Sequence, residues 1–222
     1  SGVTMTTTAA IATANTINGS GSVAITSLDA DLDANLAGVT ASGGVTYATT
    51  TISDTTKSFT GTLAAGVATI TGTNTTGDIF NVDGATLGTA TFVVTDAILQ
   101  GTAAKLTGKT VTGNGNVEVS ALNATLGANL ANLDNGSGAV SSAFSANGTF
   151  TGNLGTSSVA VASGVTMTTT AAIATANTIT GAGTLAVTAL NATLTADLSN
   201  NTVTGHTAAF SADGTFSGNL GD

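Results

Sequence analysis

The chain has 222 residues, with 12 acidic residues against three lysines and one histidine, and a formal net charge of −9. It contains no Cys, which excludes disulfide scaffolds and cysteine-based metal sites. Its only strong cations are Lys57, Lys105 and Lys109, too few for the clustered basic residues that nucleic-acid binding requires. Because 41% of the residues are apolar and the net charge is modest, disorder is not expected either.

The chain contains no stretch that predicts a membrane span. No apolar run approaches the roughly 18–20 residues that a spanning helix needs, because Thr, Asn or Gly interrupts each one, as around residues 9–12. The sequence opens with Ser1-Gly2 and shows no basic and apolar signal-peptide pattern. Export of a longer chain that contains this segment stays open.

Long internal repeats predict the architecture. Residues 1–17, SGVTMTTTAAIATANTI, recur unchanged at 163–179. A second motif begins at residue 21 and returns 94 and then 68 residues later, at 115 and 183. A third block, AFSANGTFTGNLG at 143–155, returns 66 residues later as AFSADGTFSGNLG at 209–221. The repeat unit is therefore 66–68 residues long, equivalent to three coils of roughly 22 residues in a stacked structure.

One continuous repeat array is expected over residues 1–222. Its approximate units are 1–94, 95–162 and 163–222, and the first has about 26 additional residues, which we interpret as one inserted coil near 66–94. No atypical terminal repeat is visible in the sequence. We therefore expect the two ends of the array to stack on more of the same structure.

Apolar residues alternate along several short segments, which is the pattern of β-strands. The segments are, in chain order, 23–25, 117–119, 159–161, 165–167 and 185–187. Val, Ile, Thr and Phe favour strands, and the intervening Gly and Asn favour turns. The inward-facing residues predicted from this pattern are Val23, Ile25, Val117, Val119, Phe150, Leu154, Leu185, Val187, Phe216 and Leu220.

One segment, residues 122–133, also fits a helical pattern, with Leu122, Leu126, Leu130 and Leu133 at spacings of four, four and three. Thr, Asn and Gly are poor helix formers, so a strand is the preferred prediction.

Small side chains favour an all-β parallel β-solenoid over tandem β-sandwiches. Sandwich cores are usually built on large residues, but only 4% of this chain is aromatic and Trp is absent. Ala, Val and Thr suit the narrow interior of a β-helix whose coils stack at about 4.7–4.9 Å.

Asp29, Asp31 and Asp33 form the one acidic cluster. On a strand their carboxylates would face one side and could bind Ca²⁺ together with Asn35. The equivalent positions in the other copies are Asn, Thr or Gly, and the calcium-binding glycine-rich nonapeptide is absent. A solvated acidic face is therefore the preferred interpretation, and no metal site is predicted.

His206 is the only histidine and could form a catalytic triad with Asp197 or Asp213 and a serine. The equivalent position in the preceding copy is Val140, so the repeat unit does not use it. A surface or turn histidine is preferred, and no catalytic residue and no cofactor are predicted.

Two further kinds of motif have ordinary explanations. Residues 19–24 and 181–186 match GxGxxA, but they open strands and not helices, so turns are favoured over dinucleotide binding. The Thr-x-Thr strings at 4–8 and 166–170 resemble rows on ice-binding solenoids, but they occur only once per long unit. Ordinary strand threonine is preferred.

The strings NATLGANLANL (123–133), DGTFSGNLG (213–221) and GVTMTTTAAIATANTITGAGT (164–184) resemble the Thr/Ala/Gly-rich "beta strand repeat" regions of large bacterial surface proteins. Such regions occur in surface-layer proteins, giant adhesins and extracellular fibres. The resemblance covers the whole chain and rests on amino-acid composition and on the recurrence of short motifs. It identifies no functional residue. It implies an exported structural protein.

The expected function is non-enzymatic: an extracellular filament, sheath or surface layer built by head-to-tail stacking of the solenoid. The expected partner is the chain itself, with cell-surface or matrix polysaccharide as a further candidate and with neither nucleic acid nor a membrane span involved. The alternative is the stalk or binding region of a secreted adhesin, with calcium dependence. A β-helical polysaccharide lyase is disfavoured because such an enzyme needs a basic group beside acidic metal ligands.

Overall fold

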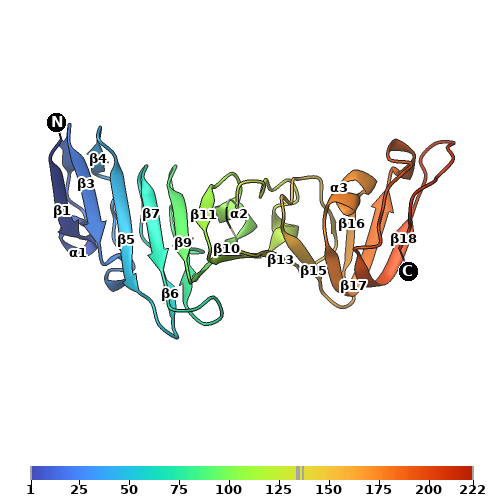
Figure 1. The fold of residues 1–222 in the computed structure, drawn as a ribbon, viewed down its shortest axis with the longest axis horizontal. Helices are drawn as coiled ribbons and strands as arrows, with labels where there is room; N and C mark the ends of the chain where they lie inside the picture. The colour runs from blue at the N-terminus through green and yellow to red at the C-terminus, as the bar shows by residue number, and fades with distance from the viewer. Residues whose placement is uncertain (1, 134–135, 137, 222) are drawn as a thin grey trace. The chain divides into compact units, whose positions relative to one another are not determined.

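The computed structural model describes residues 2–133, 136 and 138–221. Within these residues, nearly all regular structure is β-strand, and every strand pair for which a register is given is parallel. Each strand pairs with the strand that follows or precedes it by one coil (Figure 1). The predicted all-β parallel β-solenoid is therefore confirmed.

The elements follow one another at short intervals. The strands up to residue 113 are β1 (Thr4–Thr8), β2 (Ile17–Gly19), β3 (Ser22–Thr26), β4 (Val39–Ala41), β5 (Val45–Thr51), β6 (Thr56–Ser58), β7 (Val67–Thr71), β8 (Ile79–Asn81), β9 (Thr91–Thr95), β10 (Ile98–Thr102) and β11 (Val111–Gly113). The later strands are β12 (Asn116–Ser120), β13 (Val140–Phe144), β14 (Gly148–Thr149), β15 (Ser158–Val161), β16 (Thr166–Thr170), β17 (Ile179–Thr188) and β18 (Thr202–Ala208). The short α-helices are α1 (Ala9–Ala12), α2 (Ala103–Leu106) and α3 (Ala171–Ala176).

The chain divides into two compact units. Unit 1 comprises Ser1–Gly101, Lys109–Glu118 and Asn132–Ala139, and unit 2 comprises the remaining segments, Thr102–Gly108, Val119–Ala131 and Val140–Asp222. The three longer elements at the start of unit 1, β1, β3 and β5, lie side by side in Figure 1. In unit 2, β16 and β17 lie side by side in the same way.

The strands form two long sheets and one short one. The six-stranded sheet has the order β1-β3-β5-β7-β9-β11, and β2 pairs with β4. The ten-stranded sheet has the order β14-β16-β17-β15-β13-β12-β10-β8-β6, with β18 also on β17. The sequence separation between residues paired across adjacent coils ranges from 17, for Ser141 and Ser158, to 24, for Val67 and Thr91. The prediction was roughly 22 residues per coil.

Apolar side chains stack along the axis inside unit 1. Ile25, Tyr47, Ala68, Phe92 and Val111 are successive partners in the register of the six-stranded sheet. Each of them is at most 2% exposed. The small Ala68 lies between two large aromatic residues, so the volumes of neighbouring layers compensate and the narrow interior is filled.

A left-handed residue and a short 3₁₀ turn follow three equivalent strands. The turns are η1 (Leu28–Ala30), η2 (Leu122–Ala124) and η3 (Leu190–Ala192). Each is preceded by a residue with positive φ, namely Ser27 at 56°, Ala121 at 51° and Ala189 at 55°. The strand predicted over residues 122–133 is therefore wrong. Three of the four leucines in this segment, Leu122, Leu130 and Leu133, are buried and reach the core from turns, whereas Leu126 is partly exposed.

A buried carboxylate fixes the loop between β7 and β8. Asp78 is fully buried, and its carboxylate accepts hydrogen bonds from the backbone N–H groups of Asp54 and Thr73, both at 2.5 Å, and of Asn74 at 3.0 Å. The Thr73 hydroxyl donates a fourth bond at 2.8 Å. Burial raises the pKa of Asp78, but the hydrogen bonds together outweigh it and hold this pKa below its ordinary value. The carboxylate is thus the ionised anchor of the loop.

None of the helices in the described part of the chain has the length and apolar character that crossing a membrane would require.

Candidate functional site

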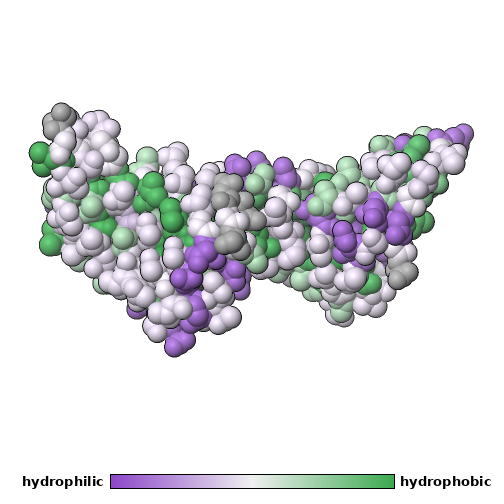
Figure 2. Space-filling model, in the orientation of Figure 1, coloured by the Kyte–Doolittle hydropathy of each residue, from purple (hydrophilic) through white to green (hydrophobic). Residues whose placement is uncertain are grey.

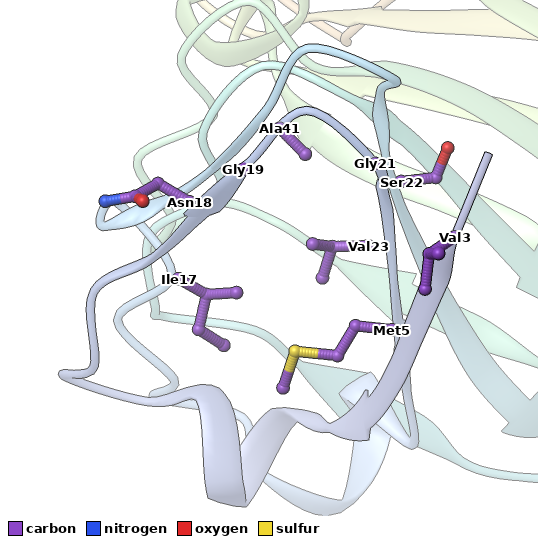
Figure 3. A pocket seen from close by; sticks show the side chains of 9 residues that line it. All are labelled: Val3, Met5, Ile17, Asn18, Gly19, Gly21, Ser22, Val23 and Ala41. Atoms are coloured by element: carbon purple, nitrogen blue, oxygen red, sulfur yellow. The ribbon is translucent and has the colours of Figure 1, made fainter. Parts of the chain in front are cut away.

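A pocket of about 180 Å³ opens at the first coil. Its lining consists of apolar side chains, backbone and two small polar residues, with no titratable group: Val3, Met5, Ile17, Asn18, Gly19, Gly21, Ser22, Val23 and Ala41. Figure 3 shows the side chains of Met5, Ile17 and Val23 directed into the same space, from β1, β2 and β3 respectively. Such a lining can receive apolar side chains, but it offers no acid, base or nucleophile.

The edge beside this pocket is unusually apolar and exposed. Val3 is 73% exposed, Met5 45% and Ile11 65%. Strand β1 pairs with β3 from Thr4 to Thr8 and is the terminal strand of the six-stranded sheet, so within the described residues its other edge has no partner strand. We call this free edge with its exposed Val3, Met5 and Ile11 the β1 surface. A free strand edge is a template for pairing with another segment.

The same 17-residue sequence forms a strand followed by a short helix in both of its copies, although α3 has six residues and α1 has four. Strand β16 and helix α3 repeat strand β1 and helix α1. The side-chain amide of Asn15 donates to the carbonyl oxygen of Ile11 at 2.8 Å, and Asn177 donates to Ile173 at 2.8 Å. The two copies therefore share the strand and the start of the helix, but they differ further along, where Ala14 has a φ of 57° and its counterpart Ala176 lies in α3.

Their exposure differs strongly. Met167 is fully buried although its counterpart Met5 is 45% exposed, and Ile179 is fully buried although Ile17 is partly exposed. Two segments cover the second copy: β14, within the block 143–155, pairs with β16, and Val159 of β15 pairs with Ile179. We call residues 143–155 the internal block. It occupies the position that is open at the β1 surface.

The repeated block at 209–221, which we call the C-terminal block, is exposed. Phe210 is 45% exposed and Leu220 47%, whereas their counterparts in the internal block, Phe144 and Leu154, are at most 1% exposed. Phe216 is partly exposed as well. The prediction that Phe216 and Leu220 are core residues is therefore wrong, because among the residues that the structure describes this block contacts the preceding coil and no following one. The other eight predicted inward residues are at most 5% exposed.

The large apolar side chains that are exposed are concentrated at these two places. Of the six in the described residues, five lie on the β1 surface or in the C-terminal block, and the sixth is Val67, at 38% exposure. On the face drawn in Figure 2 most of the surface is pale, and strongly hydrophilic regions form only a few clusters. The repeats in the sequence identify the β1 surface and the C-terminal block as copies of internal segments. They do not show which copy of each segment is covered.

The acidic cluster is not arranged as a cation site. Residues 28–30 form a 3₁₀ turn, so the strand on which the three carboxylates were expected is absent. Asp29 is 8% exposed and accepts hydrogen bonds from the backbone N–H and the hydroxyl of Thr50, both at 2.5 Å. Asp31 accepts from Thr13 at 3.2 Å. Among the described residues, no group of three His, Cys, Asp or Glu side chains is placed to hold a metal ion.

His206 lies in strand β18 beside Leu185, partly exposed, and not in a turn. Within the described part of the chain, its buried Nε2 has no hydrogen-bond partner. The Asp197 carboxylate is engaged elsewhere: hydrogen bonds from the hydroxyl and the backbone N–H of Ser199 hold its pKa below the ordinary value. Asp213 is exposed. Within the described residues, no hydrogen bond joins His206 to Asp197 or Asp213, so the catalytic triad considered from the sequence is not assembled.

The glycine and threonine motifs have structural roles. Residues 19–24 run from the end of β2 into β3, and residues 181–186 lie inside β17, so neither string opens a helix. The threonines of β1 do not form a continuous rank, because Thr6 pairs with Ala24 in the next strand.

Comparison of the chain with protein-family models, with curated proteins and with solved structures finds no match.

Proposed function

We propose that this chain is a non-enzymatic structural repeat protein that forms an extracellular filament, sheath or surface layer by end-to-end stacking of its β-solenoid. The observation that carries the proposal is the contrast between β1 and β16. The two strands have identical sequences, but β16 is covered by another coil and β1 presents a free edge with exposed apolar side chains.

The physical argument follows from the free edge. Unpaired backbone groups and exposed apolar side chains on one strand favour addition of another strand. An interface between two different surfaces of the same chain is heterologous, and such contacts continue into open filaments unless the rotation closes a ring. The formal net charge of −9 opposes association between copies, so salt should strengthen it by screening this repulsion.

The absence of enzymatic activity is part of the proposal and rests on the repeats. The one histidine has Val140 as its counterpart, and the acidic residues 29, 31 and 33 are replaced in the other copies by Asn, Thr or Gly. The pocket at the first coil has no titratable lining residue. The extracellular location rests on the resemblance to bacterial surface repeats, and polysaccharide is a further candidate partner.

Electron microscopy of the purified chain over a range of concentrations tests the function. Filaments with a meridional reflection near 4.7–4.8 Å would support stacking along the solenoid axis. Sedimentation velocity with interference optics gives the mass, since the chain has no Trp and one Tyr and absorbs weakly. A chain that stays monomeric up to millimolar concentration would contradict the proposal and favour the adhesin stalk.

A further inference from the structure

The interface inside unit 2 shows how this sequence joins two coils. Strand β14 pairs with β16, with Thr149 opposite Thr168. The backbone N–H of Phe150 donates to the carbonyl oxygen of Thr168 at 2.8 Å. The hydroxyl of the fully buried Thr169 donates back to the carbonyl oxygen of Phe150 at 3.0 Å. The internal block thus satisfies both backbone and side-chain groups of the strand that it covers.

A side-chain acceptor adds a further contact. The backbone N–H of Thr166, at the start of β16, donates to Oδ1 of Asn147 at 2.7 Å. In the C-terminal block the corresponding residue is Asp213, and a carboxylate oxygen can accept the same bond. The other difference between the two blocks is Ser217 in place of Thr151, which keeps the hydroxyl group. The C-terminal block therefore retains the chemistry of the internal block.

The C-terminal block is held to the preceding coil at the same two points as the internal block. Ser211 N–H donates to Oδ1 of Asn191 at 3.1 Å, and Ser145 N–H donates to Oδ1 of Asn123 at 3.1 Å. Asn219, like its counterpart in the internal block, makes a backbone bridge to the preceding coil, to Asp197. Because both this block and the β1 surface are folded before they meet, docking needs little additional ordering, which favours affinity.

We propose that the C-terminal block of one copy of this chain docks on the β1 surface of a second copy, in the register that joins β14 to β16. This inference rests on the proposed self-association and specifies its contact. Thr215 then lies opposite Thr6 of the second copy, and Asp213 accepts a hydrogen bond from the Thr4 N–H. The Thr7 hydroxyl donates to the carbonyl oxygen of Phe216.

The junction buries apolar side chains from both copies. Met5 becomes covered as Met167 is, and Phe210 and Leu220 become covered as Phe144 and Leu154 are. The proposed junction concerns the contact between the C-terminal block and β1, and we expect this contact to depend on concentration.

Engineered cysteines test the register directly, because the natural chain contains none. Paired residues in adjacent strands lie about 4.8 Å apart, within the range of Cα separations that a disulfide spans. The double variant Thr6→Cys/Thr215→Cys should give a ladder of covalent multimers under mild oxidation. In the control Thr4→Cys/Thr215→Cys the two Cα atoms lie about 8 Å apart, beyond the range that a disulfide bridges, so it should give at least about tenfold less ladder.

Two blocked variants test the pairing of surfaces. Met5→Asp places a charge on the β1 surface, and Leu220→Asp places one on the C-terminal block; both sites are about half exposed, so each variant should fold. Each alone should associate about a hundredfold more weakly, because an unpaired carboxylate would be buried. An equimolar mixture keeps one intact surface of each kind and should form 1:1 dimers and nothing larger.

Two further variants serve as controls. Val67→Asp changes the one large apolar residue that is exposed outside both surfaces in the described part of the chain, and it should leave association unchanged. Asp213→Asn restores the sequence of the internal block and should preserve association. Circular dichroism and sedimentation of each variant check folding and mass.

The outcomes separate this junction from the proposed function. Dimers in the mixture without filaments of the unsubstituted chain would uphold the junction and overturn the filament. Two results would overturn the junction alone. One is that Leu220→Asp forms filaments as readily as the unsubstituted chain does. The other is that the two cysteine pairs crosslink equally well. Absence of association in every sample would overturn both.

Discussion

The matched leucines Leu154 and Leu220 offer the sharpest test of how burial differs between the two copies of one block. Both follow a Gly-Asn pair in the same local sequence, but Leu154 is 1% exposed and Leu220 is 47% exposed. We expect Leu154→Ala to destabilise unit 2 much more than Leu220→Ala in the monomer. The reason is that only Leu154 is covered by the coil that follows it.

The magnitudes follow from burial. Removing a fully enclosed leucine side chain costs about 3–5 kcal/mol, which includes the cavity left behind. A leucine that is about half exposed loses roughly half of the 1.5–3 kcal/mol of full burial and leaves no enclosed cavity, so Leu220→Ala should cost about 1 kcal/mol. The expected difference is therefore about 2–4 kcal/mol.

Hydrogen exchange read by mass spectrometry suits this chain, because it has no Trp and its one Tyr, Tyr47, lies in unit 1. At concentrations where the chain is monomeric, the slowest amides of β15 and β17 should exchange about a hundredfold or more faster in Leu154→Ala. In Leu220→Ala they should accelerate about fivefold. Peptides from unit 1 provide the internal reference. Equal acceleration in the two variants would refute the burial argument.

Three other perturbations have defined outcomes. Asp78→Asn should lower the melting temperature. In the unsubstituted chain, the contribution of Asp78 to stability should be full above its ordinary pKa of 3.8 and should be lost as the pH falls towards the depressed pKa of the folded state. Acid titration followed by circular dichroism checks both expectations, and an unchanged acid midpoint in the variant would contradict this role of Asp78. Millimolar calcium should leave the thermal unfolding of unit 1 unchanged because Asp29 is already hydrogen-bonded, so a shift of several degrees reversed by a chelator would contradict this interpretation. Ala189→Gly relieves the strain of a left-handed alanine and should raise the free energy of unfolding by about 0.5–1 kcal/mol. The control Ala192→Gly, in the turn that follows, should lower it by a similar amount. Denaturant titration distinguishes the two variants, and equal losses of stability would argue against strain at Ala189.

Much of the fold was predictable because the signals are local. The alternation of apolar residues at 23–25, 117–119 and 185–187 identifies strands, since the side-chain period of a strand is two. The offsets between repeats give the approximate coil length. The segment 122–133 was not predictable in this way, because Ala121 adopts a left-handed conformation that its residue type does not favour. That bend is imposed by the coil and not by local propensity.

The candidate site was predictable only in part. The repeats identify residues 3–17 and 209–221 as copies of internal segments, but the same pattern placed Phe216 and Leu220 in the core. Burial depends on whether a following coil is present, which is a property of stacking between segments far apart in the chain. The acidic cluster shows the same limit, because the hydrogen bonds between Asp29 and Thr50 join residues 21 positions apart.

The sequence by itself determined the strands, the repeat and the exclusion of nucleic-acid and cysteine chemistry, since these follow from local period, identity and composition. Only the tertiary structure decided exposure. It places identical strands in two environments, so that Met167 is covered and Met5 is not. The physical reason is that a solenoid coil is completed by its neighbours: each strand needs partners on both edges, and which edges are filled depends on the stacking of whole coils.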